Sequence, residues 1–188
     1  MAVQFDHLVL RVPAGDLPRV RSELGNRSWV IAGGGLGIGW HSDEFAAIVA
    51  GAGPSPSFDG ADVTERRQLV ATARPDDATP PALDPGVLAL RWFELDSSDW
   101  PEFLDLSTNA WPAFEQAYDA RILGLFRSLD LPEPQAGALL VTWYPSLSAW
   151  ERSRGTLRAT EGGEAEAGRK FLRRREITKR SIVRVSPC

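Results

Sequence analysis

The sequence of 188 residues is poor in cysteine, histidine and lysine: it holds one Cys, two His and two Lys beside 19 Arg. The single cysteine, Cys188, cannot form an internal disulfide, which is typical of a reducing cytoplasm, and it excludes zinc sites built on cysteine pairs. No apolar run approaches the roughly 18 residues of a membrane helix, and no secretory signal is recognisable. We therefore expect a cytoplasmic protein without a membrane segment. The Arg-rich, Lys-poor composition points to a GC-rich bacterial genome.

Two motifs that would indicate nucleotide or nucleic-acid binding are incomplete. The glycine-rich run AGGGLGIG, residues 32–39, is followed by Trp-His and a strand-like segment. A phosphate loop would need a following helix and Gly-Lys-Ser/Thr, so we predict a glycine-rich strand or bulge. The basic cluster at 173–175 lies in a segment, 151–188, of net charge +6, but residues 1–150 carry −10 and would repel phosphates. We expect no nucleic-acid partner.

The most informative segment, residues 86–150, reads as strand, helix, strand, strand and the start of a second helix. Strand patterns occur in GVLALRWFEL, RILGLFRSLD and GALLVTWYP. After the first of these, apolar side chains recur every three or four residues from Trp100 to Tyr118, which predicts an amphipathic helix. Pro112 lies inside this helix and predicts a kink or two shorter helices, because proline has no amide hydrogen. With the final strand TKRSIVRV, the order is β-α-β-β-α-β.

A shift of 83 residues places the first half of the chain over the second. Asp16-Leu17-Pro18 then coincides with Asp99-Trp100-Pro101, and in both copies these residues open a helix after a strand. TERRQLVATAR would be the fourth strand of the first copy. The second helix of that copy is missing, because PSPSFDGAD is short and rich in Pro, Ser and Gly. We predict a degenerate repeat over 1–84, a second repeat over 86–188 and a proline-rich linker at 74–86.

A β-α-β-β-α-β unit covers one face of its sheet with helices and leaves the other face bare. That bare face must pack on a second sheet, and two repeats in one chain can satisfy each other. The predicted fold is therefore α+β, with tandem ferredoxin-like repeats that pack their antiparallel sheets into a fused α/β barrel.

The second half resembles a NIPSNAP-type domain of the dimeric α/β-barrel superfamily. The resemblance lies in ELDSSDWPEFLDLSTNAWPAFE, in Gly124-Leu125-Phe126 of the following strand and in WYPSL at 143–147. It covers residues 86–188 and extends to 1–84 only as a degenerate copy. The superfamily includes cofactor-independent monooxygenases, haem-degrading enzymes, isomerases and dehydratases, and it implies a small aromatic or polyketide substrate. Such a fold does not by itself name a reaction.

The candidate ligand-binding residues lie on the long helix and the neighbouring strands. Trp111 and Tyr118 are two turns apart on the face that would point at the sheet. The resemblance implies that Asn109 and Trp111 bind a phenolic substrate, as a similar Asn and Trp do in superfamily oxygenases. Two observations favour a plain core instead: aromatic side chains at this spacing fill cores, and Asn109 lies about 200° from Trp111 around the helix. We predict a pocket between the C-terminal sheet and this helix, lined by Trp92, Trp111, Tyr118 and Trp143.

Few side chains in this sequence can move a proton near neutral pH. We predict that His41 and Tyr118 handle protons, and that Arg91 holds an anionic substrate if it faces inward. A structural role is the alternative for His41 and for His7, the other histidine. The sequence has no dinucleotide fingerprint, phosphate loop or cysteine pair, so we expect no tightly bound cofactor and no metal. Any metal found would first implicate His7 and His41.

Two functions are compatible with these residues. The first is a small-molecule-binding protein or a cofactor-independent enzyme of the oxygenase, isomerase or cyclase type, acting on a hydrophobic, aromatic ligand. The alternative is a non-catalytic interaction or self-assembly module whose aromatic residues are all core. Either is compatible with a homodimer. Seven Trp in 188 residues exceed what packing a small core usually needs, which favours the small-molecule-binding protein or enzyme. An open cavity beside Trp111 with an inward-facing polar residue would support it, and a filled interior would support the alternative.

Overall fold

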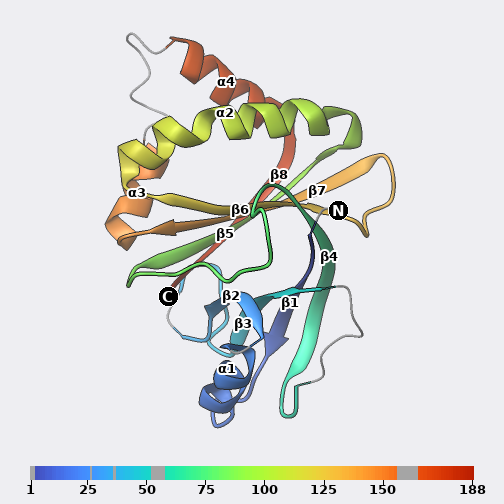
Figure 1. The fold of residues 1–188 in the computed structure, drawn as a ribbon, viewed down its shortest axis with the longest axis vertical. Helices are drawn as coiled ribbons and strands as arrows, with labels where there is room; N and C mark the ends of the chain where they lie inside the picture. Colours follow the sequence, from blue (N-terminus) through green and yellow to red (C-terminus); the bar gives the residue numbers. More distant parts are fainter. Residues whose placement is uncertain (1–2, 26, 36, 52–57, 156–164) are drawn as a thin grey trace.

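A computed structural model shows the fold (Figure 1) and describes residues 3–25, 27–35, 37–51, 58–155 and 165–188. The elements in chain order are β1 (Gln4–Arg11), α1 (Leu17–Gly25), β2 (Ser28–Gly33), β3 (Glu44–Ala50), β4 (Asp62–Arg74), β5 (Val87–Asp96), the 3-10 turn η1 (Ser97–Asp99), α2 (Trp100–Tyr118), β6 (Arg121–Ser128), β7 (Gln135–Tyr144), α3 (Leu147–Gly155), α4 (Ala165–Glu176) and β8 (Thr178–Pro187). The predicted strand-helix-strand-strand order occurs in both halves.

The eight strands of the described residues form one antiparallel sheet in the order β2-β3-β1-β4-β6-β7-β5-β8. The first four positions give the ferredoxin-like order of the N-terminal half, and the last four repeat it for the C-terminal half. The two halves join where β4 pairs with β6, from Leu69 opposite Ser128 to Arg74 opposite Leu125. The sheet rolls so that its end strands, β2 and β8, approach each other. The prediction of an α+β fold with tandem ferredoxin-like units fused into a barrel is confirmed.

The loop after β2 joins the second edge of the barrel. Main-chain hydrogen bonds link Ile38 and Val185 in both directions, at 2.8 and 2.9 Å, and the Gly33 amide donates to Ser186 Oγ at 2.9 Å. A Cβ atom at Gly37 would lie 2.5 Å from the carbonyl oxygen of Val185. Only glycine therefore lets the loop after β2 approach β8 this closely. The glycine-rich run therefore serves the closure of the barrel.

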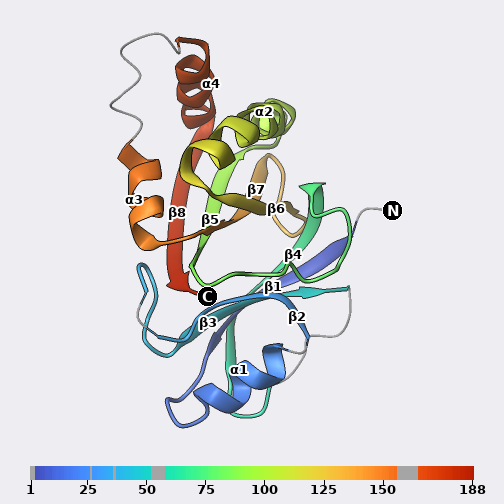
Figure 2. The ribbon, with the colours of Figure 1, turned by 60° about the vertical axis from the view of Figure 1, so that its left-hand side comes forward.

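The two halves of the sheet face each other, and the helices lie outside them (Figure 2). Inside the barrel, the rings of Phe5, Trp29 and Phe126 meet edge to face, with centroids 5.1 to 5.7 Å apart. On the N-terminal side, α1 buries Val20 and Leu24 against the sheet. On the C-terminal side, α2 buries Trp100, Phe103, Ser107 and Trp111. The barrel interior is thus a packed core, and each half also has a core beneath its helices.

Three local features can be compared with the sequence expectations. The helix around Pro112 is one continuous element, α2, rather than two short helices. The second helix of the C-terminal half is two helices, α3 and α4. In the N-terminal half, the described residues between β3 and β4 contain no helix, as expected; part of that segment, 52–57, lies outside the described residues. None of the described helices is long and apolar enough to cross a membrane.

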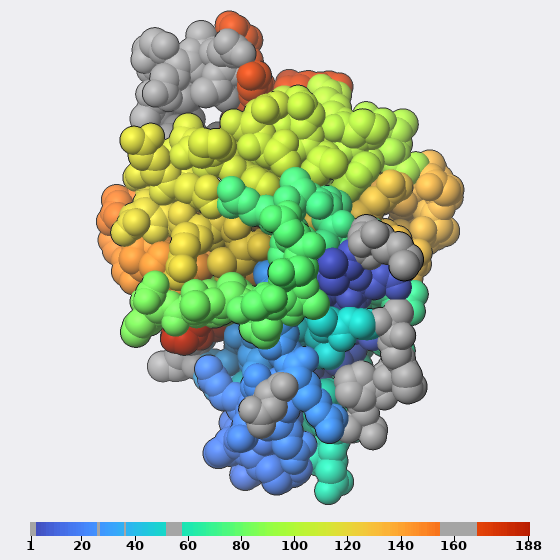
Figure 3. All heavy atoms as spheres, in the orientation of Figure 1, coloured from blue at the N-terminus to red at the C-terminus, as the bar shows by residue number. Residues whose placement is uncertain are grey.

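The linker between the halves lies along the molecular surface and is held by side chains of both (Figures 1 and 3). Trp29 of β2 donates its indole N–H to the carbonyl of Thr79 at 2.9 Å, and Trp143 of β7 donates to that of Asp84 at 2.9 Å. Arg121 of β6 pairs with the Asp84 carboxylate at 3.2 Å. The linker therefore contributes to the contact between the halves.

We predict that the boundary between residues 84 and 86 separates two repeats that depend on each other. Residues 1–80 and 81–188, produced as separate polypeptides, should each be insoluble, because each exposes the sheet face that forms the barrel interior. Co-expression should restore a soluble complex, measured as co-purification through a tag on one half. Two halves that fold independently as monomers would contradict the prediction.

His7 is the buried titratable group of the barrel interior. Its side chain is 6% exposed, and its Nδ1 has no hydrogen-bond partner among the described residues. Burial lowers the pKa of His7 to about 4; Glu65 opposes this shift, and Arg67 and Arg184 reinforce it. His7 is therefore neutral in the folded protein at neutral pH. At acidic pH its protonation places a positive charge in a buried site, which is unfavourable.

This shift predicts an acid-dependent loss of stability. Because the pKa of His7 lies below the ordinary value of 6.5, the unfolded chain binds the proton first as pH falls. The free energy of unfolding should drop by about 2–3 kcal/mol between pH 6.5 and pH 4.5 from this group alone. Urea denaturation at both pH values should show this part of the drop in the wild type and in His41→Gln, but not in His7→Gln. An equal drop in all three proteins would contradict it.

Candidate functional site

A cavity of about 680 Å³ lies between the helices and the outer face of the C-terminal half of the sheet. This volume is within the range of pockets that hold small molecules. Its lining residues come from β5 (Ala89, Arg91), α2 (Leu106, Asn109, Ala110, Trp111, Ala113, Phe114), β6 (Ile122), β7 (Leu140, Thr142, Tyr144), α3 (Ser153, Arg154), α4 (Lys170, Phe171, Arg174) and β8 (Ser181, Val183). The cavity thus has an aromatic and aliphatic wall together with polar and basic groups.

Arg91 rises from the C-terminal half of the sheet into this cavity. It lies on β5, with Leu140 of β7 opposite it on one side and Val183 of β8 on the other. Among the residues that the structure describes, none forms a hydrogen bond or an ion pair with its side chain. Burial lowers the pKa of Arg91, because water no longer fully solvates the charged guanidinium.

Arg174 reaches the cavity from the last turn of α4. Its guanidinium carbon lies 5.4, 5.9 and 5.8 Å from the ring centroids of Phe93, Phe103 and Phe171. Its one described side-chain hydrogen bond, to Ser107 Oγ, is long at 3.5 Å. Burial, and next the positive charge of Arg91, lowers the pKa of Arg174 to about 10. Arg174 is still a cation at neutral pH, held by aromatic rings.

Tyr144 is the phenol of the cavity. It is 5% exposed, and Ser153 Oγ lies 3.5 Å from its hydroxyl oxygen. Burial raises the pKa of Tyr144, although the neighbouring Arg91 opposes the shift. The hydroxyl is therefore protonated at neutral pH and can donate a hydrogen bond to a bound molecule.

Three of the predicted site residues line this cavity: Arg91, Asn109 and Trp111. Trp111 is 5% exposed and belongs to the core beneath α2, so it is at once a core residue and a wall of the cavity. Asn109 is exposed and donates a hydrogen bond to the Asp105 carboxylate at 2.9 Å, which places it at the rim. The structure brings these three residues to one cavity; their roles in binding a ligand stay predictions.

The placement predicted for Trp92 and Trp143 is wrong. Both side chains belong to the barrel interior on the opposite face of the sheet. Arg67 lies over the ring of Trp92 at 4.1 Å, and Arg121 over that of Trp143 at 4.3 Å. Successive residues of a strand point to opposite faces, so Trp92 cannot share a pocket with its neighbour Arg91.

His41 and Tyr118, the predicted proton-handling residues, are not among the described residues that line the cavity. His41 is exposed on the loop before β3, and its main-chain amide donates to Glu44 Oε2 at 3.2 Å. Tyr118 ends α2 and packs on Phe114, with ring centroids 5.1 Å apart. Sequence reasoning missed Tyr144 instead, the neighbour of Trp143 that faces the helices.

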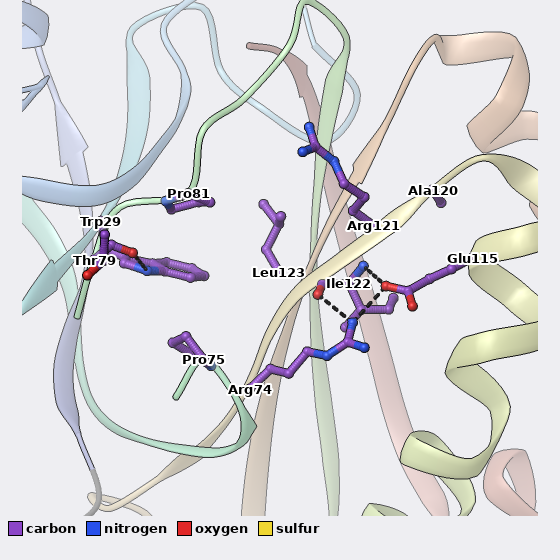
Figure 4. A pocket seen from close by; sticks show the side chains of 10 residues that line it. All are labelled: Trp29, Arg74, Pro75, Thr79, Pro81, Glu115, Ala120, Arg121, Ile122 and Leu123. Carbon is purple, nitrogen blue, oxygen red and sulfur yellow. Dashed lines mark hydrogen bonds and ion pairs between the residues drawn. The ribbon is translucent and has the colours of Figure 1, made fainter. Parts of the chain in front are cut away.

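A second, more open cavity of about 470 Å³ lies where the linker meets β6 (Figure 4). Arg74 and Glu115 point toward one another there and form an ion pair of 2.7 Å. Glu115 also accepts a hydrogen bond from the Ile122 amide, and Arg74 donates to the Ile122 carbonyl. These polar groups satisfy each other, so this cavity has the character of a structural junction between the halves.

Comparisons with known proteins identify the fold. No family model matches the sequence, and no curated protein matches it. The structure is similar to a ferredoxin-fold protein from Listeria monocytogenes related to antibiotic biosynthesis monooxygenases, with a TM-score of 0.54, 10% identity and coverage of 100% of this chain and 96% of that one. It is also similar to an anthrone oxidase-like protein, with a TM-score of 0.58, 13% identity and coverage of 98% of this chain and 90% of that one.

A NIPSNAP family protein from Agrobacterium tumefaciens matches only in part, with a TM-score of 0.40, 18% identity and coverage of 53% of this chain and 82% of that one. The NIPSNAP resemblance of residues 86–188 stays a prediction. At these identities the comparisons establish architecture and no activity. The chain has the α+β fold of the dimeric α/β-barrel, ferredoxin-like proteins.

Proposed function

We propose that the protein binds a small, hydrophobic, aromatic molecule in the cavity beneath α2 and acts on it as a cofactor-independent enzyme of the oxygenase type. The observation that carries the proposal is the cavity itself, whose volume of about 680 Å³ suits a small organic ligand. Proteins of the same fold include one related to antibiotic biosynthesis monooxygenases and one that is anthrone oxidase-like. The NIPSNAP resemblance and a cytoplasmic location remain part of this proposal.

The walls of the cavity favour a flat aromatic ligand. Trp111, Phe114, Tyr144 and Phe171 contribute rings to the lining, and such rings offer stacking surfaces beyond what aliphatic walls provide. The indole N–H of Trp111 is buried and has no hydrogen-bond partner among the described residues. Trp111 also lines the cavity, which distinguishes this side of α2 from a fully packed core.

The chemistry we propose relies on side chains rather than on a bound group. The described lining contains no His, Cys or Met; of the side chains that ligate haem iron it contains only a tyrosine, Tyr144. No cluster of three or more His, Cys, Asp or Glu that could hold a metal occurs in the described part of the chain. Tyr144 supplies the one phenol of the described lining, which can donate a proton or a hydrogen bond to the ligand; Thr142, Ser153 and Ser181 contribute further hydroxyl groups.

The binding proposal can be tested by filling the cavity. Ala110 lines it from α2, whereas Ala117, two turns further on, does not. Ala110→Trp should abolish binding of a neutral two-ring probe, 2-naphthamide, followed by titration calorimetry, because the new side chain occupies the space. Ala117→Trp should bind like the wild type. Oxygen uptake with phenolic aromatic compounds then tests the oxygenase part.

The alternative function predicts different results in the same experiments. A non-catalytic interaction module would bind no aromatic probe, and Ala110→Trp would behave like Ala117→Trp. Binding without any turnover would favour a carrier over an enzyme. A visible absorption band from haem or flavin in the purified protein would contradict the cofactor-independent part of the proposal.

Trp111 belongs both to the core beneath α2 and to the wall of the cavity, and this gives a stability prediction. Trp111→Ala should lower the free energy of unfolding by about 3–5 kcal/mol, because it removes a buried ring between the sheet and α2. Trp111→Phe should lose much less, since it keeps an aromatic ring and its missing N–H had no partner among the described residues. Urea denaturation measures both. A loss from Trp111→Ala as small as that from Trp111→Phe would assign the side chain to the cavity wall alone.

A further inference from the structure

The cavity gathers positive charge in a protein that is acidic overall. Its described lining contains Arg91, Arg154, Lys170 and Arg174 but no Asp or Glu, while the whole chain has a net charge of −4. Like charges that share a partly dehydrated space repel each other more strongly than they would in water. Such a lining lowers the cost of placing a negative charge in the cavity.

Several of the other arginines pair their guanidinium groups with carboxylates. Six of them form ion pairs of 3.2 Å or less with carboxylates: Arg19 with Glu23, Arg66 with Asp6, Arg67 with Glu65, Arg74 with Glu115, Arg121 with Asp84 and Arg173 with Glu102. Neither Arg91 nor Arg174 has a carboxylate partner within the described ranges. The contrast is sharpest on α4, where Arg173 is exposed and paired while Arg174 is more buried and is not.

Arg91 and Arg174 approach the cavity from two directions. Arg91 rises from the sheet and Arg174 descends from α4, and their positive charges act on each other. The rings of Phe93, Phe103 and Phe171 fix Arg174 without neutralising it. Two planar guanidinium groups held in this way offer paired N–H donors of the geometry that a carboxylate accepts.

We propose that Arg91 and Arg174 form an anion-binding subsite in the cavity, and that the ligand is an aromatic carboxylate. Its carboxylate lies between the two guanidinium groups, and its ring system lies against the aromatic wall that includes Trp111. This inference rests on the proposed function, because it names the class of molecule that the same cavity takes. It adds charge recognition to a pocket otherwise suited to any flat apolar ligand.

The test compares 2-naphthoate with 2-naphthamide, which has the same ring system and no charge. The wild type should bind naphthoate at least tenfold more tightly by titration calorimetry, which corresponds to about 1.4 kcal/mol. Arg91→Met and Arg174→Met should each raise the Kd for naphthoate at least tenfold and change the Kd for naphthamide less than twofold. Arg175→Met is the matched control: Arg175 follows Arg174 on α4, is exposed and lies outside the lining, so its loss should change neither Kd.

A second measurement needs no ligand. Arg91→Met keeps most of the aliphatic stem and removes an unpaired charge from the cavity, so it should raise the Tm of the free protein by about 2–4 °C. A residue that held the structure together would give the opposite sign. A lower Tm for Arg91→Met would therefore overturn the subsite.

The binding results separate the two proposals. Equal Kd values of the wild type for naphthoate and naphthamide would overturn the subsite and leave the proposed function standing. If Arg91→Met weakened the binding of both probes equally, Arg91 would determine the shape of the cavity rather than bind the anion. That result would also overturn the subsite and leave the proposed function standing. If the wild type binds neither probe, both proposals are wrong.

Discussion

The packing of two bare sheet faces against each other within one chain is the constraint on which the rest of this structure depends. It fills the barrel interior with Phe5, Trp29 and Phe126 and forces every helix to the outside. An enclosed space for a ligand can then form between a helix layer and the outer sheet face. The N-terminal half covers its face with the nine-residue α1, whereas the C-terminal half uses the 19-residue α2 together with α3 and α4. The cavity lies under the larger layer.

The fold was predictable because its signals are local and repeated. The strand and helix periods, the Asp-x-Pro helix starts and the 83-residue shift all pointed to two similar units, and a half-covered sheet then requires a partner. The closure between Ile38 and Val185 was not predictable in the same way. It depends on a close approach of two segments far apart in the sequence, and the glycine run that permits this approach reads equally well as a bulge or a loop.

The site was predictable only as a region. β5 and β7 are buried on both faces, so hydrophobic alternation does not say which face meets the helices. Strand geometry alone could still have excluded the pairing of Arg91 with Trp92, which are neighbours in sequence and must point apart. By the same rule, Trp143 and Tyr144 point to opposite faces of the sheet, so only one of them can face the cavity. Arg174 was hidden because a run of three arginines reads as a solvated helix end, and nothing local distinguishes its middle member.

The difference between Arg174 and the paired arginines suggests why the cavity lacks acidic residues. Arg67 and Arg121 also lie over tryptophan rings, and each has a carboxylate partner; Arg184 lies over Trp40 without a carboxylate partner among the described residues. Three phenylalanine rings lie 5.4 to 5.9 Å from the guanidinium carbon of Arg174, and a ring orients a cation without neutralising it. A carboxylate beside Arg174 would stabilise the free protein and remove the charge that an anionic ligand needs. Placing the aromatic support there, and the acids elsewhere, keeps the arginine ordered and its charge available.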